Sequence, residues 1–352
     1  MKKKLIVLIA GVFVAALCCS AFLLMMAIPM PGPLSYSVLG CVVMLTVERD
    51  VPLAPFSTFR IGGPADFFAS VTTVADLIEA LEYAADNSLK TFVFSGGSNL
   101  LFADHGFRGL VIRIANASAR VSGHDIIADA GAPLLSIVRL AISHGLAGLE
   151  RLAGIPGSLG GAIRGNAGAF GAEIRDSVLS VKVYDRQAKM LREFSMKQCD
   201  FGYRQSYFKT HPEIVILSAT LRLEEWNAAE LGRIAEETIS VREAKHPQSA
   251  RCAGSFFMNP IVTDDTLREE FTHDTGKIPK DNKLPAGWLI DHVGLRGKHI
   301  GGAQVSALHP NYIVNTGDAT AEQVIMLASL VKQRVRDELD VQLREEVQLV
   351  GF

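Results

Sequence analysis

The chain has few of the features that mark metal-binding, disulfide-bonded or nucleic-acid-binding proteins. Of its five cysteines only Cys199 and Cys252 lie beyond residue 45, and neither a C-x-x-C pair nor a cysteine–histidine spacing suits zinc. The formal net charge is -2, and Lys and Arg are spread along the chain without a basic stretch. We therefore expect no metal site, no nucleic-acid partner, and free thiols in a reducing compartment.

Two common nucleotide-binding motifs are also missing. No G-x-G-x-x-G follows the first expected strand, and no G-x-x-x-x-G-K-[ST] occurs. A standard dinucleotide fold and a P-loop are therefore disfavoured. Glycine is abundant instead, with 31 residues clustered in a few loops. Because glycine has no side chain, such loops can bring a backbone close to a ligand.

Residues 1–45 form an apolar N-terminal segment. Leu5–Met30 carries no charge and is long enough to span a bilayer as a helix, and the prolines and glycine of 29–33 interrupt it. Three interpretations stay open: a start assigned too early, with Met44 as the true start; a membrane anchor, as one span or a helical hairpin; or a cleaved signal peptide. Membrane contact is expected only if residues 5–45 are retained.

The rest of the chain mixes helical and strand patterns irregularly. Apolar spacing predicts helices over 74–85, 134–144, 228–245 and 320–338. Runs rich in apolar and β-branched residues predict strands over 91–95, 110–114, 126–130, 178–185, 214–223 and 341–350. The pattern predicts an α+β body: two N-terminal subdomains, 46–115 and 116–225, a connector helix within 226–248, and a C-terminal α/β lobe, 249–352.

Two glycine-rich loops are the strongest functional signal. The first follows an expected strand and reads Gly96-Gly97-Ser98-Asn99; taken alone, it is more typical of a plain tight turn. The second has seven glycines in the eighteen residues from Gly154 to Gly171. A stretch so poor in side chains contributes little to a core, which disfavours a purely structural role. Together the loops predict a cradle for a pyrophosphate and the isoalloxazine edge of a flavin.

Short motifs follow one another in the order that one enzyme family shows. They are Ser57–Gly63, Gly96–Asn99, Pro156–Ala162, Asn166–Ala169, Tyr203–Ser206, Ala253–Pro260, Ala286–Ile290, Gly301–Gly302 and Glu346–Val347. From about residue 56 onward the chain resembles the UDP-N-acetylenolpyruvoylglucosamine reductases. The segment between Tyr203 and Ser255 is too short for the extra substrate loop of one subtype, so the shorter, second subtype is the better match.

The resemblance implies a fold, a reaction and a cellular location. The fold would be the two-subdomain FAD-binding fold of the vanillyl-alcohol-oxidase (PCMH) type with a C-terminal substrate-binding lobe. FAD would be the cofactor, NADPH the reductant, and UDP-N-acetylglucosamine enolpyruvate the substrate, reduced to UDP-N-acetylmuramate for peptidoglycan synthesis. Such an enzyme would work in the cytoplasm, with attachment to the inner membrane only through the N-terminal segment. Its oligomeric state stays open.

The resemblance also implies FAD contacts in the glycine loops and near them. The expected cofactor-binding residues are Arg60, Gly96, Gly97, Ser98, Asn99, Leu100, Gly154, Ile155, Pro156, Gly157, Ser158, Gly161, Ala162, Asn166, Gly168 and Ala169.

Three residues match the catalytic positions of the family. Arg204 would face the substrate carboxylate, since a guanidinium fork suits a carboxylate. Ser255 would donate a proton to the carbon next to that carboxylate. Glu346 would act with Arg204 on the developing enol; it is preferred to Glu345 because it precedes Val347 in the family's Glu-Val pattern.

Substrate contacts are expected mainly in the C-terminal lobe. Asn259 and Lys245 are the expected partners of the sugar nucleotide and its diphosphate, and His309 is a weaker candidate. Met258 stands where the family commonly has lysine, which puts a charge contact there in doubt.

Two other functions stay open at this stage. A related FAD-dependent sugar or alcohol oxidase would leave Arg204, Ser255 and Glu346 idle, because it protonates no carbanion. A membrane-tethered, non-catalytic flavin- or nucleotide-binding protein would draw on the N-terminal segment.

Overall fold

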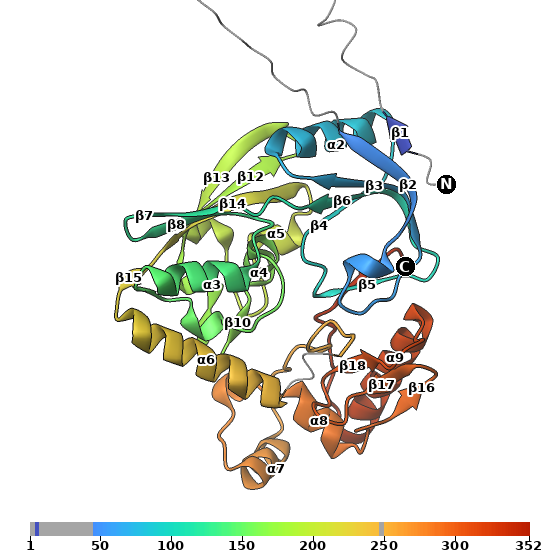
Figure 1. The fold of residues 1–352 in the computed structure, drawn as a ribbon. Coiled ribbons are helices and arrows are strands. Elements are labelled where there is room, and N and C mark those ends of the chain that lie inside the picture. The colour runs from blue at the N-terminus through green and yellow to red at the C-terminus, as the bar shows by residue number, and fades with distance from the viewer. Residues whose placement is uncertain (1–3, 7–44, 246–249) are drawn as a thin grey trace, which may run out of the picture.

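The computed structural model describes residues 4–6, 45–245 and 250–352. Two five-stranded sheets form the upper part of the structure, and a smaller C-terminal lobe lies below them (Figure 1). The first sheet has the order β1-β2-β3-β6-β4. Its strands are β1 (Lys4–Ile6), β2 (Thr46–Pro52), β3 (Pro64–Val71), β4 (Thr91–Phe94) and β6 (Phe107–Ile114). Strands β3 and β4 pair parallel with β6, whereas β2 pairs antiparallel with β1 and β3.

Helix α2 (Val74–Asp86) connects β3 to β4. It begins with a capping box, in which the Thr73 side chain accepts from the Asp76 backbone N–H and the Asp76 carboxylate accepts from that of Thr73. The predicted helix over 74–85 is confirmed.

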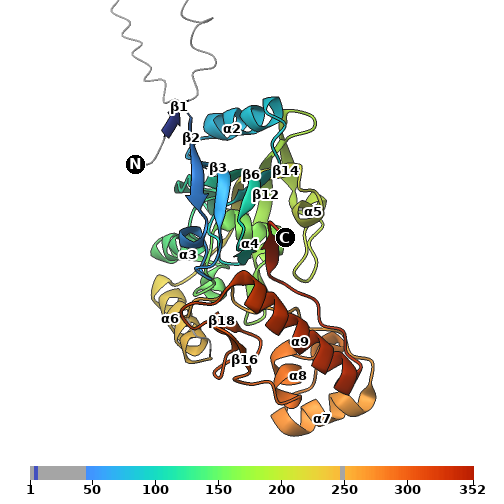
Figure 2. The ribbon, with the colours of Figure 1, turned by 90° about the vertical axis from the view of Figure 1, so that its right-hand side faces the viewer.

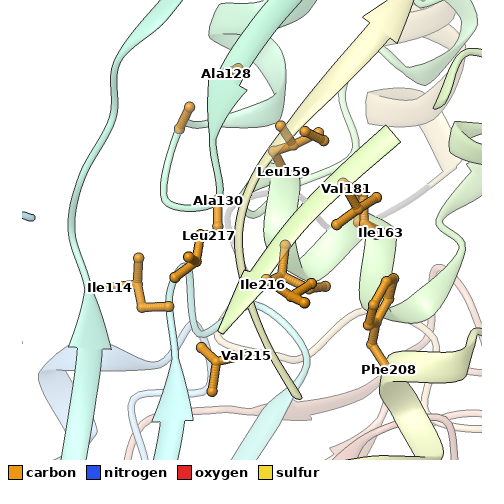
Figure 3. Packing of buried hydrophobic residues seen from close by; sticks show 14 of the residues in the cluster. Ile114, Ala128, Ala130, Leu159, Ile163, Val181, Phe208, Val215, Ile216 and Leu217 are labelled. Carbon is orange, nitrogen blue, oxygen red and sulfur yellow. The ribbon is translucent and has the colours of Figure 1, made fainter. Parts of the chain in front are cut away.

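The second sheet is antiparallel throughout, in the order β13-β12-β14-β8-β7. Its strands are β7 (Ala119–Ser122), β8 (Asp125–Asp129), β12 (Val178–Asp185), β13 (Met190–Ser195) and β14 (Ile214–Arg222). The helices are α3 (Leu134–Ser143), α4 (Leu159–Gly165) and α5 (Tyr207–Thr210). Figure 3 shows Ile163 of α4 and Phe208 of α5 beside Ile216 of β14. One hydrophobic core runs through both sheets, so they pack as a single platform.

Helix α6 (Ala228–Lys245) leads from the platform to the C-terminal lobe. The lobe holds the helices α7 (Asp265–Thr275), α8 (Ala286–His292) and α9 (Ala321–Leu339). Its antiparallel sheet consists of β16 (His299–Ile300), β17 (Ala303–Val305) and β18 (Ile313–Asn315). Short ladders elsewhere join β9 (Leu146–Ala147) to β15 (Glu224–Glu225) and β10 (Gly168–Ala169) to β11 (Ala172–Glu173).

The end of the chain returns to the platform (Figure 2). Strand β19 (Gln348–Val350) pairs parallel with β5 (Leu100–Phe102), directly after the first glycine loop. Phe59, Ile61 and Leu101 of the platform in turn lie in the core of the C-terminal lobe. Backbone pairing and hydrophobic packing therefore both join the two parts.

One strand prediction is largely wrong. Of the expected strand 341–350, only Gln348–Val350 is a strand; the preceding residues are extended, with one bridge between Phe257 and Glu345. Val341, Leu343 and Val347 lie in the lobe core, so their alternation reflects burial of an extended segment rather than a ladder.

The N-terminal predictions lie mostly outside the described residues. Of the apolar segment, the structure describes Lys4–Ile6, as strand β1, and the buried Leu45 at its end. Among the residues that the structure describes, no helix combines the length and the apolar character needed to cross a bilayer. Cys199 and Cys252 are free and buried, and burial raises the pKa of the Cys199 thiol to about 12.

Asn315 supplies a testable link between platform and lobe. Its side chain donates to the carbonyl oxygen of Phe59 (3.0 Å) and accepts from the N–H groups of Gly317 (2.9 Å) and Ala319 (3.1 Å). Asn315→Ala leaves the buried Phe59 carbonyl oxygen and the buried Ala319 N–H unpaired, so we expect it to lower the free energy of unfolding by about 3 kcal/mol in urea titrations. The exposed Asn87→Ala is the control; an equal loss in both variants would contradict the prediction.

Candidate active site

The two glycine-rich loops touch each other. Ser98 Oγ donates to the carbonyl oxygen of Pro156 at 3.1 Å. Gly157 has a φ of +115°, and a Cβ built on it would lie 2.6 Å from Ser98 Oγ. A Cβ on Gly96 would lie 3.0 Å from the Gly157 Cα. Only glycine allows the two backbones to approach so closely, so the loops form one cradle.

One side of the cradle is open backbone without side chains. Ideal Cβ atoms on Gly165 and Gly171 would meet nothing within 4 Å, and Gly96 and Gly161 are exposed. Backbone that faces open space without side chains can take a phosphate on its N–H groups and a flat ring against its surface. The residues present therefore suit the cofactor that the sequence predicts.

Most of the expected cofactor residues lie in this cradle or next to it. Those in and after the first loop are Gly96, Gly97, Ser98, Asn99 and Leu100; those in and after the second are Gly154, Ile155, Pro156, Gly157, Ser158, Gly161, Ala162, Gly168 and Ala169. Arg60 is exposed and donates through Nη1 to the carbonyl oxygen of Pro55 at 2.8 Å.

Asn166 is the exception among these expected contacts. It is 0% exposed, and its Nδ2 donates to Glu173 Oε2 (2.9 Å) and to the Gly202 carbonyl oxygen (2.8 Å). Its Oδ1 accepts from the Arg175 N–H. A side chain with no accessible surface cannot touch a ligand, so direct cofactor binding by Asn166 is a wrong expectation. The residue instead fixes the turn after α4, where its φ is +43°.

Arg204 and Glu346, far apart in the sequence, form an ion pair. Arg204 Nε lies 2.7 Å from Glu346 Oε1, and the two side chains are 23% and 19% exposed. Arg204 Nη2 also donates to the carbonyl oxygen of Gly168 at 2.9 Å, in the second glycine-rich loop. The neighbouring carboxylate, Glu345, pairs instead with Lys332 at 2.8 Å. The structure thus separates the two adjacent glutamates, although no strand forms there.

The backbone of Glu346 is tied to the first loop and to the Ser255 segment. Asn99 Nδ2 donates to the Glu346 carbonyl oxygen at 3.0 Å, and the Glu346 N–H donates to the Phe256 carbonyl oxygen at 2.8 Å. Both glycine-rich loops and the Ser255 segment therefore meet at the Arg204–Glu346 pair.

Burial raises the pKa of Glu346 above its ordinary value, while Arg204 and Lys209 act in the opposite direction. The carboxyl group therefore holds a proton more readily than a free glutamate does. When it ionises, the neighbouring Arg204 and Lys209 stabilise its negative charge. Such a group can serve a site where negative charge appears during a reaction.

Ser255 lies on the wall of a cavity, half-buried. Phe256 and Phe257 after it are each 1% exposed, and Asn311 holds their backbone: the Phe256 N–H donates to its carbonyl oxygen at 2.7 Å. The Ser255 hydroxyl shares a hydrogen bond with Tyr312, whose pKa is raised by burial. The serine thus stands on a fixed backbone with its hydroxyl toward a buried phenol.

The cavity beside Ser255 has a volume of about 390 Å³. Asn259 and His309 line it, as expected for substrate contacts, and so does Arg296. Asn259 Oδ1 also accepts from the Ala286 N–H at 3.0 Å. Burial lowers the pKa of His309, so the ring is neutral at physiological pH. Lys245 ends α6, and its side chain lies outside the described part of the chain.

Sequence reasoning missed several groups around the site. The hydroxyl of Tyr203 accepts from the Asn259 N–H, and Lys283 Nζ lies 4.5 Å from the centre of its ring. Lys209 Nζ donates to the Arg204 carbonyl oxygen at 2.8 Å. Tyr203 belongs to the motif that contains Arg204, which was a usable signal; no sequence spacing points to Lys209 or Lys283.

Comparisons with known proteins agree with this geometry. A model of an FAD-binding domain matches residues 65–193, and a model of the C-terminal domain of UDP-N-acetylenolpyruvoylglucosamine reductase matches residues 246–350. The UDP-N-acetylenolpyruvoylglucosamine reductase of Solibacter usitatus is 38% identical over 87% of this chain and 97% of its own length. The chain belongs to the UDP-N-acetylenolpyruvoylglucosamine reductase family.

Other members of the family extend the match. The reductase of Paramagnetospirillum magneticum is 40% identical over 86% of this chain and 91% of its own length. The crystal structure of the reductase from Thermus caldophilus superposes with a TM-score of 0.69 at 32% identity, covering 87% of this chain and all of the other. The α+β fold with a two-subdomain FAD-binding platform and a C-terminal lobe is therefore that of the reductase family.

The contact between the glycine-rich loops gives a test of the cradle. In Gly157→Ala the new Cβ would collide with Ser98 Oγ, at a φ of +115° that alanine rarely adopts. We expect the purified reductase variant to lose most of its flavin absorbance near 450 nm relative to protein. Gly232→Ala, within α6 and with no atom closer than 4.0 Å, should keep it; equal flavin content in both variants would count against the cradle.

The raised pKa of Glu346 gives the reductase a pH dependence of known sign. Because the folded carboxyl binds its proton more tightly than the unfolded one, the free energy of unfolding falls as pH rises from 4.5 through the folded pKa. Glu346→Gln cannot titrate. The stability of the unchanged protein relative to this variant should therefore rise as pH is lowered through the folded pKa, which urea unfolding at several pH values would measure. A pH-independent difference would contradict the prediction.

Proposed function

We propose that this chain reduces UDP-N-acetylglucosamine enolpyruvate to UDP-N-acetylmuramate, with Arg204, Ser255 and Glu346 as its catalytic residues. One observation carries the assignment of these roles: the Arg204–Glu346 pair is bonded to both glycine-rich loops and to the Ser255 segment. A flavin in the cradle and a substrate in the cavity would thus meet at these three side chains.

FAD held in the cradle and reduced by NADPH would be the source of the hydride for the terminal carbon of the enolpyruvyl double bond. The protein has to bind the enolpyruvyl carboxylate and stabilise the negative charge that builds up next to it. Arg204 has the guanidinium group for this task, and only 23% of its side chain is exposed, which strengthens its field.

Ser255 supplies the proton that completes the reduction. Its hydroxyl gives H⁺ to the carbon adjacent to the carboxylate, which has become a strong base. The buried phenylalanines after Ser255 exclude water on one side, and the Tyr312 hydrogen bond restricts the hydroxyl. A weak acid that is held in place can protonate a carbanion when competing water is absent.

Glu346 acts as the partner of Arg204 in this scheme. Its raised pKa lets the carboxyl group share a proton with the developing enol, and its ion pair keeps the guanidinium directed at the substrate. Hydrogen bonding to the charge that appears in the transition state accelerates the step without tightening binding of the substrate itself.

The cavity beside Ser255 would hold the nucleotide-sugar part of the substrate. Asn259 and His309 on its wall are the proposed sugar-nucleotide contacts, and Arg296 adds donors on the same wall. Lys245 is kept as a proposed diphosphate partner on the basis of its place at the end of α6. We place the enzyme in the cytoplasm, where NADPH and nucleotide sugars are found; attachment to the inner membrane would depend on residues 5–45.

Ser255→Ala tests the proton donor. The variant should still bind flavin and accept hydride from NADPH, because Ser255 takes no part in that half-reaction. We expect reoxidation of the reduced flavin by the enolpyruvyl substrate to slow by at least about 1000-fold, measured anaerobically by stopped-flow absorbance.

Ser143→Ala, an exposed serine of α3, is the matched control and should behave as the unchanged enzyme. Normal reoxidation in Ser255→Ala would reject the assignment of the proton donor. If the unchanged enzyme itself ignored the substrate but consumed oxygen with sugars or alcohols, an oxidase would replace the reductase.

A further inference from the structure

Arg204 stands in an unusual backbone conformation. Its φ is +52°, in the left-handed region that a non-glycine residue adopts only when its surroundings hold it there. The side chain is held by Glu346 and by the Gly168 carbonyl oxygen. The backbones of Gly202 and Gln205 bond each other across the turn, at 3.0 and 3.1 Å, and this pair leaves the Arg204 carbonyl oxygen to another donor.

Lys209 makes that backbone contact. Its Nζ donates to the carbonyl oxygen of Arg204 at 2.8 Å. Because an ammonium is a charged donor, this hydrogen bond is stronger than one from a neutral group. It closes a loop from residue 204 to residue 209 at the point where the left-handed turn is made.

The position of Lys209 is itself fixed. It lies on the short helix α5, whose Phe208 is 2% exposed in the platform core. Ser206, which precedes α5, is 0% exposed and donates through Oγ to the Arg164 carbonyl oxygen at 2.7 Å. The Lys209 N–H donates to the Ser206 carbonyl oxygen at 3.0 Å. The ammonium group is thus presented from an anchored element.

Lys209 also adds charge to the site. The charged groups that face it are Arg164 from α4, Arg204 from the turn, and Glu346 from the C-terminal segment. Burial lowers its pKa, and Glu346 acts in the opposite direction. Arg204 and Lys209 both act on the one carboxylate of Glu346, and Arg164 faces Lys209, so the positive charge here favours an additional anionic group such as a carboxylate of the substrate.

We propose that Lys209 is a positioning residue of the reductase. It holds Arg204 in the left-handed turn, and its positive charge holds the carboxylates of Glu346 and of the incoming substrate in position relative to each other. The inference rests on the proposed function, because it gives Lys209 a role in the half-reaction with the enolpyruvyl substrate. It assigns Lys209 no contact with the reacting carbon and no part in hydride transfer from NADPH.

The test is the pair of half-reactions in Lys209→Met, which removes both the donor and the charge. Flavin content and flavin reduction by NADPH should match those of the unchanged enzyme. Reoxidation by the enolpyruvyl substrate should slow about 30-fold, since a misplaced binding group costs rate without abolishing the chemistry. The limb of its pH profile that reports Glu346 should move to higher pH, because a cation that faces this carboxyl group has been removed.

Two further variants separate charge from hydrogen bonding. Lys209→Arg keeps both the charge and a donor, so it should recover most of the rate and the original pH profile. Lys209→Gln keeps a donor without charge, so it should recover part of the rate and retain the shifted Glu346 limb. Lys197→Met, an exposed lysine on the same platform, is the matched control and should change neither half-reaction.

The outcomes distinguish this inference from the proposed function. If the unchanged reduced enzyme is not reoxidised by the substrate, the proposed function fails, and the inference with it. If it is reoxidised and Lys209→Met equals it in rate and pH profile, only the role of Lys209 is overturned. Equal losses in both half-reactions, without recovery in Lys209→Arg, also overturn it. If Lys209→Met does not fold, the other two variants decide. Identical pH profiles of Lys209→Gln and Lys209→Arg would then overturn the role of Lys209.

Discussion

The site depends on the partly buried ion pair between Arg204 and Glu346. Two charged side chains that are mostly withdrawn from water need each other, because removing one leaves the other desolvated and unpaired. The pair joins a turn of the platform to the last segment of the chain. Whatever keeps those two segments together therefore keeps the catalytic groups together.

Several independent contacts provide that connection. Strand β19 adds to β5 directly after the first glycine-rich loop, which places the residues just before β19 beside the cradle. Asn99 bonds the Glu346 carbonyl oxygen, and the Glu346 N–H bonds Phe256. Hydrogen bonds between backbone groups are directional and hold the segment within a narrow range of positions. The cofactor cradle, the ion pair and the Ser255 segment are thus parts of one bonded unit.

The same arrangement explains how one carboxyl group can serve both states of the reaction. Burial favours the neutral form of Glu346, whereas the cations around it favour the ionised form. When opposing influences on a carboxyl group nearly cancel, a new charge nearby changes its protonation more than when a single partner fixes its charge state. The charge that develops on the enolpyruvyl group is such a charge.

Some parts of the site could be predicted because their signal is local. A glycine-rich loop needs glycine at each close approach, so its amino-acid composition alone reveals it. The proposed catalytic trio comes from ordered short motifs, and the predicted helices were placed to within a residue or two. Asn166 was misjudged because its motif says nothing about burial, and the fold leaves it no accessible surface.

By itself the sequence determined the family, the cofactor cradle and the residue types able to bind a carboxylate and donate a proton. Tertiary structure alone decided that Glu346 forms an ion pair with Arg204 while Glu345 pairs with Lys332, that the segment before β19 stays out of a sheet, and that Lys209 bonds the Arg204 carbonyl oxygen. The reason is physical: periodicity and composition report local preference, whereas a contact between distant residues depends on how whole elements pack.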